Sequence, residues 1–177
     1  MIDRRLIGFT LIIALAVTPA LARQADPSLL TLERLFSSQE FTAEPFGQAR
    51  WIEGGAGYTK LEKSAAADNK RDLIRYETES GKRSVLVAAD RLVPAGQTAQ
   101  LGIEDYAWSA DGKKLLIFTN AQRVWRQNTR GEFWVLDLAS GKLSKLGGDA
   151  KPSTLMFAKF SPDGTRAGYV RENNLYV

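Results

Sequence analysis

The feature that most constrains this chain is a set of short motifs that recur along it. Ser109-Ala110-Asp111-Gly112 returns as Ser161-Pro162-Asp163-Gly164, 52 residues later, and Ser80-Gly81-Lys82 returns as Ser140-Gly141-Lys142, 60 residues later. Each motif contains a glycine beside polar residues, and glycine tolerates the positive φ that tight hairpin turns need. The motifs therefore predict hairpin turns, and their recurrence predicts a repeated structural unit.

Apolar runs lie between these turns and predict short strands. In the central unit, residues 106–145, the runs at 115–118 and 133–138 flank a basic segment at 123–126. Continuous apolar runs of this kind favour strands that are covered on both faces. We expect Trp51, Trp108 and Phe160 to end the first strand of their respective units. Trp108, Trp134 and Phe160 are expected in the core, because aromatic side chains are more often core residues than platforms for a ligand.

A period of 40–60 residues with four short strands per unit is typical of a β-propeller. We therefore predict an all-β fold over residues 48–177, with two full four-stranded blades and part of a third. Because a propeller closes with about four to eight blades, we expect these residues to be the N-terminal part of a larger propeller. The alternative is a small β-sandwich, which would leave its last strand with an unpaired edge.

The first 22 residues have the pattern of a secretory signal peptide. Arg4 and Arg5 precede an apolar run at residues 6–17, and Ala20-Leu21-Ala22 supplies a small-x-small cleavage site. A membrane anchor is the alternative, but twelve helical residues cover about 18 Å of a hydrocarbon core about 30 Å thick. We expect cleavage after Ala22 and a periplasmic or secreted protein with no membrane contact after cleavage.

Residues 23–47 are expected to form a lead-in to the strands. Within it, residues 28–36 predict one short helix, which Ser28 or Thr31 could cap. Its apolar residues fall on one face at helical spacing and are expected to pack on the outside of the main domain. They are Leu29, Leu32, Leu35 and Phe36.

The composition excludes several kinds of chemistry within these 177 residues. There is no histidine and no cysteine, so neither a Ser-His-Asp triad nor a His- or Cys-ligated metal site is available. The net charge of +4 comes from scattered Lys and Arg residues, which does not favour a nucleic-acid partner. The Asp111-Gly112 and Asp163-Gly164 turns lack the alternating oxygen ligands of a calcium loop. We therefore expect no catalytic residue, no metal and no cofactor here.

Four segments together resemble the dipeptidyl peptidase IV family of prolyl-oligopeptidase-like serine peptidases, specifically its N-terminal propeller domain. The most specific is Val124-Trp125-Arg126-Gln127, which is followed after a short interval by Trp134-x-Leu136-Asp137. The others are Trp108-Ser109-x-Asp111-Gly112 and Asn174-Leu175-Tyr176-Val177. Residues 30–36 also resemble the lead-in helix of bacterial members, so the likeness covers most of residues 29–177.

The resemblance implies an exported enzyme that removes N-terminal Xaa-Pro or Xaa-Ala dipeptides. In that family a propeller of roughly eight blades sits over a C-terminal α/β-hydrolase domain, gates access to the active site and anchors the peptide substrate. The resemblance also suggests a homodimer. The triad and a Glu-Glu pair that holds the substrate's amine are expected beyond residue 177, so these residues alone are expected to be inactive. The alternative function is a non-catalytic periplasmic propeller that binds protein partners.

Arg126 is the one candidate substrate-binding residue. It lies in a segment that joins two buried strands, and such connections often carry binding residues. Its guanidinium presents up to five donors and keeps its charge, which suits it to bind a carbonyl or carboxylate. The alternatives are a solvated arginine or an ion pair with Asp105 or Glu132. The resemblance implies that Arg126 contacts the carbonyl oxygen of the substrate's second residue.

Arg123, Trp125 and Arg130 are close to Arg126 in the sequence. Arg123 and Arg130 flank the same segment and are expected to be exposed charges without a binding role. Trp125 has two possible roles, either as a core aromatic residue or as a support for Arg126. The dipeptide Arg130-Gly131 is expected to form a turn.

Overall fold

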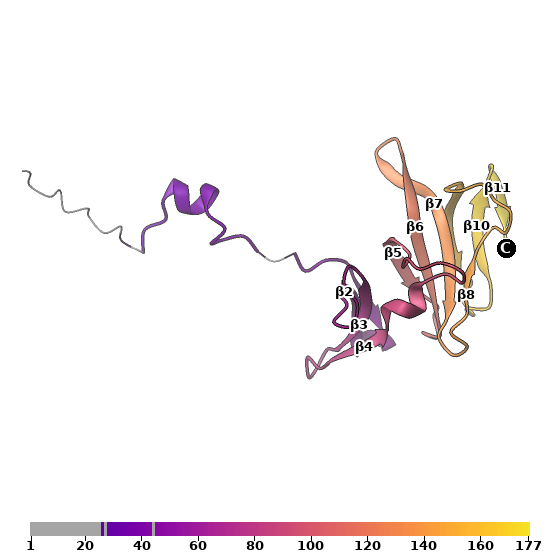
Figure 1. Ribbon diagram of the computed structural model, residues 1–177, viewed down its shortest axis with the longest axis horizontal. Coiled ribbons are helices and arrows are strands. Elements are labelled where there is room, and N and C mark those ends of the chain that lie inside the picture. The colour runs from indigo at the N-terminus through magenta and orange to yellow at the C-terminus, as the bar shows by residue number, and fades with distance from the viewer. Residues whose placement is uncertain (1–25, 27, 44) are drawn as a thin grey trace, which may run out of the picture. The chain divides into compact units, whose positions relative to one another are not determined.

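The computed structural model describes residue 26 and residues 28–43 and 45–177 (Figure 1). The predicted signal peptide at residues 1–22 lies outside the described residues. The chain divides into two compact units, residues 1–44 and residues 45–177. No helix in the described part is long and apolar enough to cross a membrane.

The described part of the first unit contains one short π-helix, η1 (Glu33–Ser37). It begins five residues later than the sequence predicts and is five residues long, with the Ser38 amide donating to the Glu33 carbonyl oxygen. Thr31 Oγ1 accepts a hydrogen bond from the Arg34 amide at 3.2 Å, but the N-cap position is held by Leu32, which makes no side-chain cap hydrogen bond. The four apolar side chains of this segment are exposed, and their packing on the second unit stays a prediction.

The second unit starts with a four-stranded antiparallel sheet of order β1-β2-β3-β4 (Figure 1). All four strands lie within residues 48–177, the part of the chain predicted to be all-β. They are β1 (Ala49–Ile52), β2 (Gly57–Lys63), β3 (Arg71–Glu77) and β4 (Arg83–Val87). Two 3-10 helices, η2 (Glu53–Gly55) and η3 (Ala89–Leu92), follow β1 and β4.

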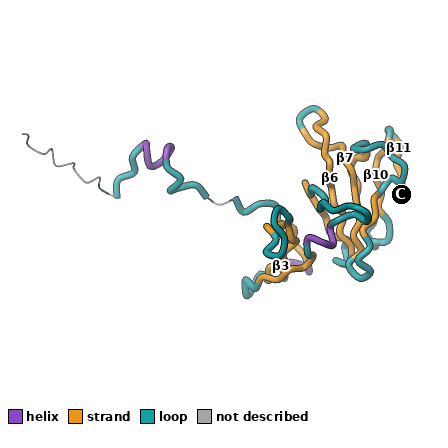
Figure 2. The backbone as a smooth tube through the Cα atoms, in the orientation of Figure 1, coloured by secondary structure: helices purple, strands orange, loops and turns teal. Residues whose placement is uncertain are grey.

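The remaining seven strands form a second antiparallel sheet (Figure 2). Its order is β11-β10-β9-β7-β6-β5, and β8 also pairs with β7. The strands are β5 (Ile103–Trp108), β6 (Lys114–Val124), β7 (Gln127–Asp137), β8 (Leu143–Lys145), β9 (Leu155–Phe160), β10 (Ala167–Arg171) and β11 (Asn174–Tyr176). The expected third blade is therefore joined to the second, because Arg130 and Gly131 of β7 pair with Met156 and Leu155 of β9.

The first half of strand β6 is buried on both faces over residues 115–117, as its continuous apolar run predicts. Leu115 and Ile117 point into a first core cluster that also contains Leu73 of the four-stranded sheet. Leu116 points the other way, into a second cluster that contains Leu155 of β9. Because side chains alternate across a strand, four consecutive apolar residues serve two cores. Strand β6 is thus covered by the first sheet on one face and by residues of β9 and the segment before it on the other.

The aromatic residues that we predicted to be equivalent differ in burial. Trp108 and Phe160 end β5 and β9 and, like Trp134, are half-buried against the two clusters. Trp51 is followed by Ile52 in β1 and is 68% exposed, so its prediction as the end of its strand was wrong. Its ring instead makes an edge-to-face contact with the ring of Tyr58 on the neighbouring strand β2.

The repeated motifs form the same turns at each occurrence. In the first Asp-Gly hairpin, the Ser109 hydroxyl donates to Asp111 Oδ1 at 2.7 Å, and Gly112 has φ +67°. In the second, Ser161 donates to Asp163 and Gly164 also has φ +67°. The two hairpins touch, because Lys114 Nζ donates to the Gly164 carbonyl at 2.9 Å. Repetition in the sequence therefore corresponds to repetition in structure, in a chain that is all-β apart from three short helices among its described residues.

Candidate functional site

The hairpin formed by β6 and β7 carries Arg126 and is longer than the sequence predicts. Pairing continues past Thr119 and Glu132 through Gln122 with Arg130 to Val124 with Gln127. The expected turn at Arg130-Gly131 was therefore wrong, since both residues lie inside β7.

Gly131 has a different role from the one predicted. A Cβ atom at this position would overlap the Phe118 ring and lie 2.8 Å from the carbonyl oxygen of Thr119. The glycine thus allows close approach of the neighbouring strand rather than a change of chain direction.

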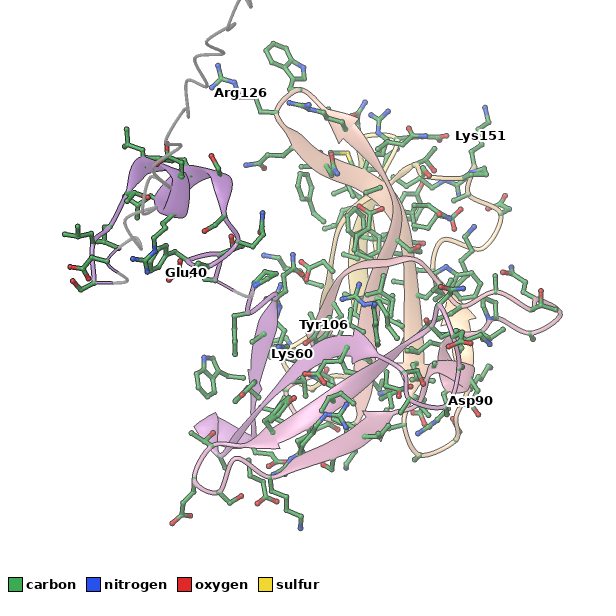
Figure 3. All side chains as sticks on the ribbon, turned by 60° about the vertical axis from the view of Figure 1, so that its left-hand side comes forward. Glu40, Lys60, Asp90, Tyr106, Arg126 and Lys151 are labelled. Carbon is green, nitrogen blue, oxygen red and sulfur yellow. The ribbon has the colours of Figure 1, made fainter. Side chains whose placement is uncertain are left out.

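The tip of this hairpin consists of Trp125 and Arg126. Figure 3 shows Arg126 at the end of the hairpin, away from the body of the sheets. Trp125 is 93% exposed and has φ +58°, a left-handed conformation that is uncommon for a bulky residue. Trp125 is therefore not a core residue. Its carbonyl oxygen accepts a hydrogen bond from Arg123 Nε at 3.0 Å.

Arg126 is exposed and has no hydrogen-bond or ion-pair partner among the described residues. The two carboxylates considered as its partners are engaged elsewhere. Asp105 pairs with Arg50 at 2.5 Å, and Glu132 pairs with Lys145 at 2.7 Å. The ion-pair alternative is therefore excluded, and the guanidinium keeps its donors available for a ligand.

The base of the hairpin is held by buried polar contacts around Glu132. Asn120 Nδ2 and Lys145 Nζ donate to its two carboxylate oxygens. Burial alone would raise the pKa of Glu132, but these hydrogen bonds outweigh it and leave the pKa below its ordinary value. Ser153 in turn donates to the Asn120 carbonyl at 2.7 Å. Side-chain hydrogen bonds therefore hold the base of the hairpin, whereas Trp125 and Arg126 at its tip are exposed.

A cavity of about 210 Å³ lies beside this hairpin, and the sequence reasoning did not predict it. Phe118, Phe133 and Phe157 supply apolar walls, while Asn128 and Thr129 of β7 supply polar groups. Phe157 has φ +56° within β9 and is 57% exposed. Only the alternation of apolar residues along β6 and β7 could have indicated this cavity, since Phe157 comes from another repeat.

The β6–β7 hairpin brings two kinds of potential binding group close to the same arm. No group of three or more His, Cys, Asp or Glu side chains in the described residues is placed to hold a metal ion. The hairpin offers an exposed cation at its tip and a partly apolar cavity at its side. Such a pair of features suits an extended, partly apolar ligand with an exposed carbonyl oxygen.

A family profile described as "Dipeptidyl peptidase IV (DPP IV) N-terminal region" matches residues 109–177. The match includes the whole β6–β7 hairpin with Arg126 at its tip. Residues 109–177 are thus similar to the DPP IV N-terminal region. The part of the sequence that carries the candidate site lies within this match.

Relatives and a solved structure extend this likeness to residues before the DPP IV N-terminal region. The chain is 29% identical over 109 residues to dipeptidyl aminopeptidase B of Saccharomyces cerevisiae, covering 62% of this chain and 12% of that protein. It is 27% identical over 157 residues to a probable dipeptidyl-aminopeptidase B of Phaeosphaeria nodorum, covering 84% of this chain and 17% of the relative. The crystal structure of Porphyromonas gingivalis dipeptidyl peptidase 4 superposes with a TM-score of 0.62 at 25% identity, over 82% of this chain and 20% of that one. The chain therefore spans a fifth or less of the length of each of these proteins.

Proposed function

We propose that this chain is the N-terminal propeller region of an exported serine dipeptidyl peptidase and that Arg126 binds its peptide substrate. The observation that carries the proposal is an exposed guanidinium without a described partner, at the tip of a hairpin inside the DPP IV N-terminal region. The similarity to dipeptidyl aminopeptidases supports the reaction class.

In this proposal the Arg126 guanidinium donates to the carbonyl oxygen of the substrate's second residue. Fixing that carbonyl orients the scissile bond, which follows the second residue, towards the catalytic domain. The preferred substrates release Xaa-Pro or Xaa-Ala dipeptides, and the propeller gates their access. Because a hydrogen bond to a charged group contributes about 1.5–3 kcal/mol, loss of Arg126 is expected to lower kcat/KM about 10- to 150-fold.

The test is the release of a chromogenic Gly-Pro amide by the full-length gene product. Arg126→Ala should lower kcat/KM by the stated factor while the thermal unfolding profile stays the same. Arg130→Ala is the matched control, because Arg130 is an exposed arginine of the same hairpin without a described partner. A loss below threefold for Arg126→Ala would remove Arg126 from the substrate site.

A full-length gene product that releases no dipeptide would instead favour the non-catalytic binding module.

Export is a separate part of the proposal and has its own measurement. Sequencing of the mature N-terminus should find Arg23 first. A mature protein that still begins at Met1 would contradict the proposed signal cleavage.

A further inference from the structure

The backbone at the tip of the β6–β7 hairpin adopts a conformation that its sequence does not favour. Trp125 has φ +58° although it is neither glycine nor asparagine, and its indole is 93% exposed. Packing of the indole therefore does not hold the turn. Such outliers persist only where surrounding contacts impose them, and they are frequent at ligand-binding sites.

One side-chain contact in the described structure does act on this turn. Arg123 Nε donates a hydrogen bond to the Trp125 carbonyl oxygen at 3.0 Å. The carbonyl belongs to the peptide unit between Trp125 and Arg126. Since a peptide unit is planar, an orientation imposed on that carbonyl also orients the Arg126 amide and Cα. The hydrogen bond from Arg123 therefore also affects the direction in which the Arg126 side chain leaves the backbone.

We propose that Arg123 is a positioning residue that holds the Trp125–Arg126 peptide plane and thereby presents the Arg126 guanidinium to the peptide substrate. This inference rests on the proposed function for its role in substrate binding, though the contact itself does not. It assigns a function to an arginine that the sequence predicts to be a solvated charge. The reason for its effect is preorganisation, because a binding group held in place loses less conformational freedom when the ligand arrives.

The hairpin supplies its own control in Arg130. Both arginines are exposed and lie on the two strands of the same arm, but Arg130 has no hydrogen bond to any described residue. Replacing either one removes the same charge from the same arm. A difference between the two variants therefore reports the contact with Trp125 rather than the electrostatic field of the hairpin.

The first experiment measures the contact without reference to activity. Hydrogen–deuterium exchange of the full-length gene product should be several-fold faster across residues 121–130 in Arg123→Ala than in wild type. Arg130→Ala should exchange like wild type, and so should β2 and β3 in both variants. Equal exchange in Arg123→Ala and Arg130→Ala would overturn the proposal, whatever the activity of the protein.

The second experiment is a double-mutant cycle on kcat/KM for the Gly-Pro amide. Arg123→Ala should lower kcat/KM about 3- to 10-fold in the wild-type background and less than twofold when Arg126 is already alanine. Arg123→Lys should recover at least half of the lost activity, since an ammonium can still donate to the carbonyl. If the loss of kcat/KM in the double variant equals the product of the two single losses, the two residues act independently. That result would overturn the positioning role of Arg123 and leave the role of Arg126 intact. If Arg126→Ala has no effect, Arg126 is not part of the substrate site, and the exchange experiment alone decides whether Arg123 holds the turn.

Discussion

At Gly131 the neighbouring strand approaches so closely that a side chain has no room. An added Cβ would overlap the Phe118 ring and lie 2.8 Å from the Thr119 carbonyl oxygen, and that oxygen belongs to the backbone and cannot rotate away. We expect Gly131→Ala to lower the free energy of unfolding by about 1–3 kcal/mol, as overpacking in a core does. The measurement is denaturant-induced unfolding of the full-length gene product. Gly102→Ala is the control, because its nearest atom would be Thr119 Oγ1 at 4.0 Å, and a loss as large there would contradict the steric explanation.

Glu132 makes stability depend on pH in the acid range. Although burial opposes it, the hydrogen bonds from Lys145 and Asn120 keep the pKa of Glu132 below its ordinary value in the folded state. The unfolded chain therefore binds a proton at a higher pH than the folded one, and this contribution is lost as pH falls below the ordinary glutamate value of about 4.3. Glu132→Gln should flatten the decline in melting temperature between about pH 5 and pH 3. An unchanged decline would exclude Glu132 as its source.

At the scale of the element, the two Asp-Gly hairpins differ in one respect that can be measured. Gly112 and Gly164 have the same φ of +67°, but only at Gly164 would a Cβ meet a neighbour, with Ser109 Cβ at 3.2 Å. Gly112→Ala should cost about 1–2 kcal/mol from backbone strain alone. Gly164→Ala should cost more, because it also separates two hairpins in contact. Equal losses in urea unfolding would show that this contact contributes nothing to stability.

At the scale of the whole second unit, the two sheets are joined by polar contacts as well as by the first core cluster. The Tyr106 hydroxyl donates to the Thr59 carbonyl at 2.7 Å, and Trp108 Nε1 donates to Thr59 Oγ1 at 3.0 Å. Thr59 and Tyr106 are both buried, so an acceptor left without its donor is costly.

Tyr106→Phe is therefore expected to lower the free energy of unfolding by about 1–3 kcal/mol. Tyr169→Phe is the matched control, because the Tyr169 hydroxyl makes no hydrogen bond within the described residues. Both variants can be compared by denaturant unfolding followed by tryptophan fluorescence. If the two lose the same stability, the contact between the sheets is not the cause.

Much of the fold could be predicted because its signals are local. A turn such as Ser140-Gly141-Lys142 depends on its own residues, with Gly141 at φ +71° and Ser140 bonded to Asp137. The apolar run at residues 115–118 likewise indicates burial on both faces without any knowledge of the neighbours. Arg126 could be selected by its residue type and position between strands, and the structure adds that it has no described partner.

The sequence by itself determined the all-β class and the repeated turns, because each follows from the preferences of neighbouring residues. It also singled out Arg126, whose binding role stays a prediction. Only the tertiary structure decided that Gly131 lies within a strand, since its role depends on Phe118 thirteen positions earlier in the chain. It also decided that Asp105 forms an ion pair with Arg50 and Glu132 with Lys145, so that neither carboxylate pairs with Arg126. The contact of Arg123 with the strained turn at Trp125 is of the same kind, because it depends on where a side chain points rather than on which residues are present.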